Sequence, residues 1–184
     1  MKRIILLSLA LVLFVCNGRA ADKFLAELSG SYLLPNDASF KDVYGQGGFV
    51  PEIRLHYDLT SSFYIWGGAG IFSKNGLTPQ TQKDAESRQI YLSLGGGTMV
   101  KLSEKIHLRV GPGVMLVAYK EEIGEDKQSG SCLGLRADAD LLYSFADKFL
   151  AGITIGYMTA SATVEEVSFK MGGFKIGAAV GMRF

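Results

Sequence analysis

Eleven charged side chains stand at alternating positions inside otherwise apolar segments of this 184-residue chain, and their types suit ion pairing or polar binding. The set consists of Glu27, Glu52, Arg54, Asp58, Lys101, Arg109, Arg136, Asp138, Asp140, Lys175 and Arg183. Charges that are shielded from water are tolerated when they are paired and hydrogen-bonded. The near balance of signs therefore predicts an ion-pair network in the interior of the fold. The sequence leaves open that the same residues line a narrow path for small solutes.

Two histidines invite a metal or acid–base interpretation, because His56 lies near Asp58 and His107 lies near Glu104. Zinc sites use closely spaced Cys and His ligands, and this chain has no such spacing. No serine stands in a recognisable nucleophile setting with either histidine. We therefore expect no catalytic residue, no metal site and no cofactor. The roles of His56, His107 and Cys132 stay open at this stage.

Period-two alternation of apolar and polar residues recurs along the chain from residue 24 and predicts β-strands with two different faces. Between residues 52 and 58, for example, the odd positions are apolar and the even positions are charged or polar. We expect eight strands, at 24–34, 49–59, 63–72, 89–102, 106–118, 132–144, 149–160 and 171–184. The third strand is ambiguous, because both of its faces are apolar.

The connections between these strands alternate in length. Tight turns follow Leu59, Leu102 and Phe145, which are 43 residues apart, and longer polar stretches occupy 35–48, 73–88, 119–131 and 161–170. Short turns at one rim, longer loops at the other and an even strand count are typical of bacterial membrane barrels. The expected fold is all-β, an eight-stranded antiparallel up-and-down transmembrane β-barrel. A soluble barrel with the pattern turned inside out would show the same alternation.

Two observations favour the membrane barrel. A basic residue that faces lipid at mid-depth costs about 2–4 kcal/mol, so the charged face of a membrane barrel must be the lumen. Aromatic residues also gather near the strand ends, as they do at membrane interfaces. We expect a girdle at the short-turn rim from Phe24, Tyr57, Tyr143, Phe149 and Phe184, and one at the other rim from Tyr32, Phe49 and Tyr157. Pro51 and Pro112 fall inside proposed strands, and a bulge or bend is expected at Gly111–Gly113.

The N-terminus reads as a secretory signal peptide over residues 1–20, of the Sec type, with the barrel domain at 21–184. Two basic residues precede a 12-residue apolar run from Ile4 to Val15, which is shorter than the roughly 20 residues of a membrane-spanning helix. The small-x-small pattern Gly18-Arg19-Ala20 then marks the expected cleavage site. Lipidation at Cys16 is the alternative. Cleavage would leave 16 basic and 18 acidic residues, and no basic patch that predicts nucleic-acid binding.

The C-terminal segment alternates to a final phenylalanine and resembles the terminal strand by which outer-membrane barrels are recognised for assembly. Its apolar face consists of Phe174, Ile176, Ala178, Val180, Met182 and Phe184. Together with the signal peptide and eight strands, it resembles the small outer-membrane β-barrel superfamily of OmpA-type, OmpX-type and OmpW-type proteins. The resemblance implies a place in the outer membrane of a Gram-negative cell envelope. The implied partners are membrane lipid, lipopolysaccharide and the barrel assembly machinery.

Fold does not determine function in this superfamily. We expect a non-enzymatic barrel with a side-chain-filled lumen and a structural, surface-contact or adhesion-type role, in which the long loops contact an extracellular ligand. The alternative is a narrow porin-like channel for small or apolar solutes. A lipid A-modifying enzyme is a third hypothesis, and the expected position of both histidines at the short-turn rim argues against it. The acidic run 121–126 is expected to be a solvated loop, with a divalent cation bridging lipopolysaccharide as the alternative.

Overall fold

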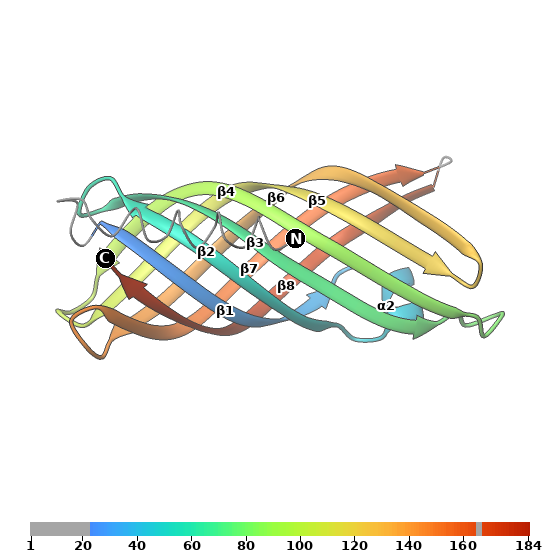
Figure 1. The fold of residues 1–184 in the computed structure, drawn as a ribbon, viewed down its shortest axis with the longest axis horizontal. Coiled ribbons are helices and arrows are strands. Elements are labelled where there is room, and N and C mark those ends of the chain that lie inside the picture. The colour runs from blue at the N-terminus through green and yellow to red at the C-terminus, as the bar shows by residue number, and fades with distance from the viewer. Residues whose placement is uncertain (1–22, 165–166) are drawn as a thin grey trace, which may run out of the picture.

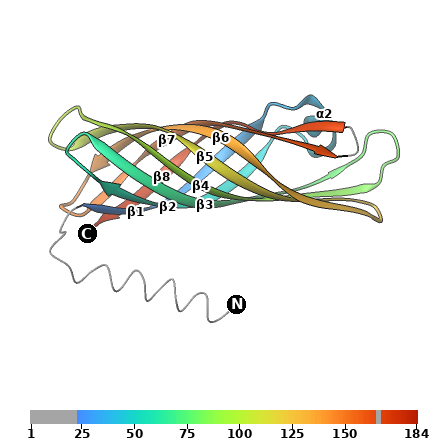
Figure 2. The ribbon, with the colours of Figure 1, turned by 90° about the horizontal axis from the view of Figure 1, so that it is seen from above.

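The computed structural model describes residues 23–164 and 167–184 and folds them into a closed eight-stranded antiparallel barrel (Figures 1 and 2). The strands follow one another around the barrel in chain order, as an up-and-down barrel requires. They are β1 (Phe24–Pro35), β2 (Gly48–Asp58), β3 (Phe63–Leu77), β4 (Asp84–Lys101), β5 (Ile106–Ile123), β6 (Asp126–Ser144), β7 (Phe149–Val164) and β8 (Val167–Arg183). In the described ranges, no helix has the length and apolar character needed to cross a membrane. The predicted fold class is confirmed, whereas the signal peptide lies outside the described residues.

Strands β1 and β8 close the barrel. Their ladder runs from the pair Leu25–Arg183 to the pair Pro35–Gly173. At the short-turn rim, the backbones of Phe24 and Phe184 exchange hydrogen bonds of 3.1 and 2.9 Å. Phe184 therefore completes the wall beside Phe24, and no described strand has a free edge at this rim.

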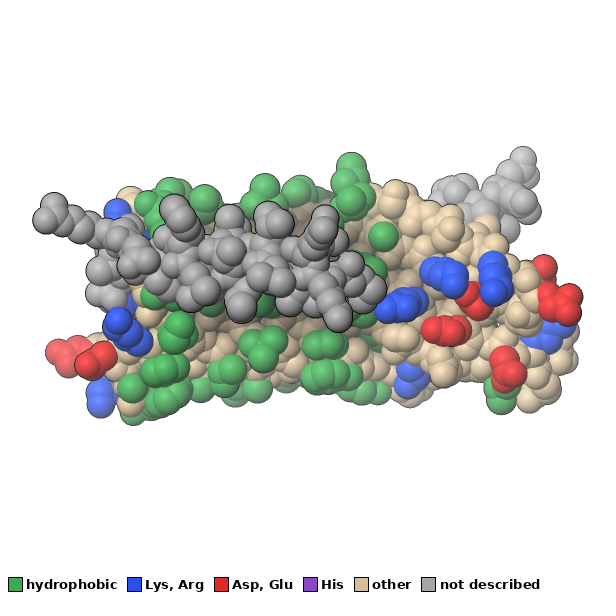
Figure 3. Space-filling model, viewed as in Figure 1, with side chains coloured by type: hydrophobic (Ala, Val, Ile, Leu, Met, Phe, Trp, Pro, Cys, Tyr) green, Lys and Arg blue, Asp and Glu red, His purple; other side chains and the backbone are tan. Residues whose placement is uncertain are grey.

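The alternation of side chains places an apolar belt around the outside of the wall. Outward leucine, isoleucine and valine residues are 41–64% exposed on the middle of the strands, as with Leu28, Leu94 and Ile153. Figure 3 shows hydrophobic side chains over the central part of the visible face and charged side chains gathered toward the two ends. Such a belt suits the hydrocarbon layer of a bilayer.

Three of the four stretches that were expected to be loops are mostly strand. The structure extends β3 and β4 to Leu77 and Asp84, and it joins β5 to β6 through only two residues, Gly124 and Glu125. Strands β7 and β8 approach each other equally closely, at Val164 and Val167. The prediction failed because both faces of a strand that projects into water carry polar residues, so the alternating signal is lost there.

The first long stretch contains a short helix, α2 (Ala38–Tyr44), which the sequence analysis did not predict. Asp37 caps its N-terminus, where the side chain accepts a hydrogen bond of 3.0 Å from the backbone N–H of Phe40. At the other end Gly45 takes a positive φ of 79° and its N–H bonds back to the Lys41 carbonyl. The helix contacts β3, β1 and β4 at the hairpin end of the barrel (Figure 1).

The two prolines interrupt strand pairing without a bulge. Around Pro112 the register of β4 against β5 is unchanged from Gly95–Gly113 to Thr98–Val110, so no residue is inserted. The missing pairs are those opposite Pro112 and its neighbour, where proline has no N–H to donate. Of the bulge or bend that was expected at Gly111–Gly113, the bulge is therefore excluded, and the structure shows a two-pair gap in the ladder instead. Pro51 lies one residue beyond Glu52, where the β2–β3 ladder ends.

Candidate functional site: the barrel interior

A four-residue ion-pair cluster spans the middle of the lumen. Arg136 donates to both carboxylate oxygens of Glu52, at 2.7 and 3.2 Å, and to Asp138 at 2.8 Å. The ammonium of Lys175 lies 2.9 Å from Glu52 and 2.9 Å from Asp138. All four side chains are at most 4% exposed. Two acids and two bases thus neutralise one another across three strands, β2, β6 and β8.

A second cluster is centred on Arg54. Its guanidinium donates to Asp140 at 2.8 and 3.1 Å and forms a close ion pair with Glu27. His56 Nε2 lies 3.6 Å from Glu27, and neither ring nitrogen of His56 has a hydrogen-bond partner among the described residues. This cluster joins β1, β2 and β6 and fills the lumen beside the first.

The third group lies toward the short-turn rim. Arg109 donates to Asp58 at 2.9 Å, and Arg183 approaches the same carboxylate at 3.6 Å. Lys101 is exposed and forms no ion pair within the described chain. The structure therefore brings ten of the eleven residues of the proposed network into ion pairs and leaves Lys101 at the mouth.

Tyr64 and Trp66 complete this interior, and sequence reasoning missed them because β3 is apolar on both faces. The Arg109 guanidinium lies 5.0 Å from the Tyr64 ring centre, and the Arg136 guanidinium lies 4.9 Å from the Trp66 ring centre. Cations over aromatic faces are stabilised by the ring quadrupole. Each ring therefore continues an ion-pair cluster across the barrel to β3.

Glycines on β4, which pairs with β3, and on the next strand, β5, make room for these rings. A Cβ added at Gly113 would lie 2.6 Å from the Trp66 ring, and one added at Gly111 would lie 2.9 Å from the Tyr64 hydroxyl. The Gly-x-Gly pairs on β4 and β5 are thus a recess that receives the aromatic side chains of β3. Their spacing was a usable sequence signal for a bulky residue opposite them.

The hairpin half of the lumen is apolar instead of charged. Its lining side chains are buried and come from seven strands: Leu33, Val50, Phe72, Tyr91, Met115, Val117, Tyr119, Met158, Ala160, Ala162 and Met171. Phe40 of α2 packs against this apolar chamber, 5.9 Å from the Phe72 ring centre. Half-buried Cys132, the free cysteine of the described chain, packs against it as well.

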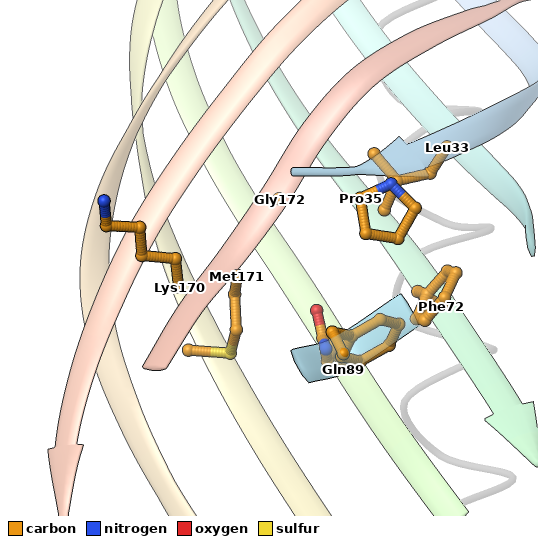
Figure 4. Close-up of a pocket in the computed structure, with 8 residues that line it drawn as sticks. Leu33, Pro35, Phe72, Gln89, Lys170, Met171 and Gly172 are labelled. Atoms are coloured by element: carbon orange, nitrogen blue, oxygen red, sulfur yellow. The ribbon is translucent and has the colours of Figure 1, made fainter. Parts of the chain in front are cut away.

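The space left beside α2 is small. Figure 4 shows the pocket between Pro35, Phe72 and Gln89, with α2 at its side. Its volume is about 10 Å³, which is no more than a single water molecule needs. Phe40 of α2 therefore closes this part of the apolar chamber.

A carboxylate beyond the apolar belt holds α2 in place. Glu121 accepts hydrogen bonds of 2.6 Å from the Tyr44 hydroxyl and 2.6 Å from the Ser87 hydroxyl. Burial raises the pKa of the Glu121 carboxyl above its ordinary value, although both hydrogen bonds act to lower it. Burial and the nearby carboxylate likewise raise the pKa of Tyr44. Glu121 was expected in a solvated loop, and the structure places it on β5 with its side chain directed inward.

Other residues of interest take the following places. His107 lies at the short-turn rim, whereas His56 is 1% exposed inside the lumen. No group of three or more His, Cys, Asp or Glu side chains in ranges 23–164 and 167–184 is arranged to hold a metal ion. On β8, the alternating set from Phe174 to Met182 faces outward, and Phe184 stacks on Phe24 with ring centres 6.1 Å apart.

Comparisons with known proteins give the fold and no family. No protein-family model matches the chain, and no curated protein matches it in sequence. Among solved structures, the outer membrane protein OprG of Pseudomonas aeruginosa is 14% identical with a TM-score of 0.69, over 89% of this chain and 96% of that one. Neisserial surface protein A is 12% identical with a TM-score of 0.65, over 88% and 97%. Ail, the attachment invasion locus protein of Yersinia pestis, is 14% identical with a TM-score of 0.55, over 89% and 99%. The chain therefore has the fold of the small outer-membrane barrels.

Proposed function

We propose that this chain is a non-enzymatic surface-contact protein of the outer membrane, with a closed lumen and a projecting β-sheet that pairs with an extracellular partner. The observation that carries the proposal is the contrast between the filled lumen and an unpaired strand edge at the hairpin end. The ion-pair clusters and α2 occupy the interior. Recognition is therefore assigned to the outside of the projecting hairpins.

The unpaired edge that we assign to this role belongs to β6. The end of β3, from Ile71 to Leu77, also pairs with one strand only, but β3 is contacted by α2. The ladder of β6 with β7 ends at the pair Gly134–Ala160, whereas its ladder with β5 continues to Ile123–Asp126. Residues 126–133 therefore pair with one neighbour only among the described residues, and 126–131 are all exposed. A free edge of this length is a template for β-strand addition, in which main-chain hydrogen bonds give affinity.

The hairpin geometry indicates which backbone groups face the partner. Residues that flank a two-residue hairpin loop bond to each other, and hydrogen-bonded and non-bonded pairs then alternate along the ladder. Ser129 and Ser131 fall in non-bonded pairs with β5, so their N–H and C=O groups point toward the free side. A proline at Ser131 removes one such donor without removing a β5–β6 hydrogen bond.

The outward-facing N–H of Ser131 allows a direct test with peptides displayed from a random library. The chain from residue 21 is embedded in lipid nanodiscs and used to select ten-residue peptides. We expect enrichment of alternating, β-branched sequences whose binding is lost in Ser131→Pro and retained in Ser131→Ala. Failure to enrich any peptide, or equal binding to both variants, contradicts the proposal. Both variants must first show the heat-dependent gel shift of a folded barrel.

The name of Ail, an attachment invasion locus protein, agrees with a surface-contact role for a barrel of this shape. It supports the proposal by analogy of fold alone. Lipid, lipopolysaccharide and the barrel assembly machinery are the proposed partners of the wall, through the outward belt and the terminal strand. The Sec-type signal peptide over residues 1–20 is part of the same proposal.

A second candidate function is passage of small apolar solutes. The apolar chamber favours it, because methionine and aromatic side chains line the hairpin half of the lumen. Release of α2 would have to empty the chamber. Uptake of a small alkane or indole into cells that produce the protein, compared with cells that carry the empty vector, tests this candidate. Faster uptake supports passage and equal uptake contradicts it.

The positions of the two histidines do not support lipid A modification. His56 and His107 lie in the lumen and at the short-turn rim, on the side away from the outer leaflet, and in the described chain neither bonds to a serine. Unchanged lipid A mass spectra after overproduction are the expected result.

A further inference from the structure

The end of β7 lies beside the free edge of β6 and pairs with one neighbour only. The β6–β7 ladder ends at Gly134–Ala160, whereas β7 goes on pairing with β8 as far as Val164–Val167. In both ribbon views the β7–β8 hairpin and the β5–β6 hairpin project apart from each other at the same end of the barrel (Figures 1 and 2). Residues 161–164 of β7 therefore present a second row of main-chain groups without a strand partner among the described residues.

The register of the existing ladder specifies how these two edges meet when they pair. Continued toward the hairpin ends, it sets Leu133 opposite Ser161 and Gly130 opposite Val164. On β6, the N–H and C=O groups of alternate residues, Ser131 among them, point away from β5. Pairing of 130–133 with 161–164 therefore adds about four main-chain hydrogen bonds. It needs no inserted residue and no shift of register.

A glycine pair bends β8 at the base of the β7–β8 hairpin. Gly172 and Gly173 have positive φ angles of 104° and 156°, and β8 stops pairing with β1 at Gly173. A Cβ at Gly173 would collide with the carbonyl of Leu34. Glycine adopts φ values of either sign at little cost, so the bend at this pair is able to change. Beyond it, a bond of 3.4 Å from the Lys170 N–H to Asp37 connects the hairpin to the segment before α2.

We infer that the end of β7 competes with the extracellular partner for the edge of β6, and so regulates the contact site. This inference rests on the function proposed above. The structure described here has the open edge. When residues 161–164 pair with 130–133, the N–H and C=O groups of Ser131 and Leu133 are bonded within the chain. Each such row pairs with one strand at a time, so the partner binds the open form alone, and its apparent affinity falls with the closed fraction.

A native cysteine lies where closure can be measured. Cys132 is half-buried and packs against the apolar chamber, and Ala162 is 6% exposed on the wall of the same chamber. Closure sets these two residues opposite each other in a non-hydrogen-bonded pair, whose Cα atoms are about 4.5 Å apart. Disulfides span Cα separations of about 4.4–6.8 Å. Ser161 is exposed on the other face of β7, so a thiol there cannot reach Cys132.

The first test forms this disulfide in Ala162→Cys, with Ser161→Cys as the matched control. Both variants, from residue 21 and embedded in lipid nanodiscs, are oxidised by air with a copper catalyst, and intact mass reports the loss of two hydrogens. We expect the disulfide in Ala162→Cys and two free thiols in the control. The binding probe is the peptide most enriched in the selection on the parent protein. Oxidised Ala162→Cys should bind it about tenfold or more weakly than the reduced form, and reduction should restore binding.

Thr163→Pro tests the competition without a disulfide. The N–H of Thr163 points toward β6 in the continued register, so proline weakens closure and leaves the β7–β8 hydrogen bonds in place. The same peptide should bind this variant at least about twofold more tightly than Thr163→Ala, because the edge is open for a larger fraction of the time. The heat-dependent gel shift first confirms that each variant is a folded barrel.

Several results overturn the inference and leave the proposed function intact. They are a missing disulfide in Ala162→Cys while the parent protein binds the peptide, equal oxidation of Ala162→Cys and Ser161→Cys, and equal peptide binding by the oxidised and reduced forms. Equal binding by Thr163→Pro and Thr163→Ala has the same meaning. Failure of the parent protein to enrich any peptide contradicts the proposed function itself, and the inference with it, before any variant is made.

Discussion

The central ion-pair cluster gives a prediction whose size follows from its geometry. Glu52 and Asp138 each contact both Arg136 and Lys175, so two negative charges face two positive ones. Glu52→Gln keeps the shape of the side chain and removes one of the two negative charges. The remaining three groups then carry an unbalanced positive charge in a space that is almost closed to water.

Removing one partner of a buried ion pair costs about 3–5 kcal/mol, because the other charge stays buried without compensation. We expect Glu52→Gln to lower the free energy of unfolding by this amount. Lys175→Met alone leaves an excess negative charge and is expected to cost a similar amount. The double variant restores neutrality through the remaining Arg136–Asp138 pair. Its cost should fall about 2–3 kcal/mol below the sum of the two single costs.

Equilibrium urea unfolding in lipid vesicles, followed by tryptophan fluorescence, gives the free energy of unfolding of the parent protein, the two single variants and the double variant. Trp66 is the single tryptophan of the chain and lies against Arg136, so it reports on this cluster directly. Glu122→Gln, which breaks an exposed pair with Lys120 on the outer hairpin, is the control and should leave the unfolding midpoint unchanged. Additive costs in the double variant, or a cost of Glu52→Gln under about 1 kcal/mol, would refute the reasoning.

Three further predictions concern the fit of α2 and of the aromatic recess. Tyr44→Phe removes the hydrogen bond to Glu121, and the loss of a bond to a charged acceptor should cost about 1.5–3 kcal/mol, seen as faster hydrogen exchange in α2; unchanged exchange would show that the bond does not hold the helix. The pKa of Glu121 is raised in the folded protein, so its contribution to stability is present below the ordinary value of 4.5 and is lost as pH rises through the higher folded value. The free energy of unfolding should therefore fall with rising pH in this range, and Glu121→Gln should remove that slope. An identical slope in the variant would contradict the raised pKa of Glu121. Gly113→Ala places a Cβ 2.6 Å from the Trp66 ring and should cost about 1–3 kcal/mol in urea unfolding; Gly67→Ala, whose Cβ would meet no atom closer than 3.7 Å, is the control, and equal costs would exclude a recess for the ring.

The membrane-spanning part of the fold could be predicted from the sequence because lipid and lumen impose opposite demands on neighbouring residues. Between residues 52 and 58 every apolar side chain faces outward and every polar one faces inward, as the alternation indicated. The same rule located strands β5 to β8 within the belt. It also placed the charged residues of the lumen together on one face.

The rule fails where one of those demands is absent. Above the belt both faces of a hairpin meet water or a polar interior, so Glu121 and Glu122 gave no strand signal although both lie on β5. On β3 the interior is itself aromatic, because Tyr64 and Trp66 stack on arginines, and the two faces look alike in sequence. The helix α2 spans only 7 residues and depends on Phe40 and Tyr44 packing inside the barrel, which is a tertiary effect.

The pairing of charges within the lumen could not be deduced either. Partners such as Arg54 and Asp140 are 86 residues apart, and they meet only because the strand register and tilt of a closed barrel bring β2 and β6 across from each other. The alternation along a strand assigns a residue to the interior of the barrel, but it does not say how deep in the lumen that residue lies. Lys101 occupies a position that the alternation assigns to the interior, yet it is exposed at the open mouth and forms no ion pair with any described residue.

The most direct test of a closed lumen is ionic current through the purified protein. The chain from residue 21, refolded in detergent and checked by its heat-dependent gel shift, is inserted into planar bilayers under an applied voltage. A lumen filled by three groups of ion pairs and by α2 predicts no single-channel steps. Steady, uniform conductance steps would contradict a closed lumen and indicate that the protein is a channel.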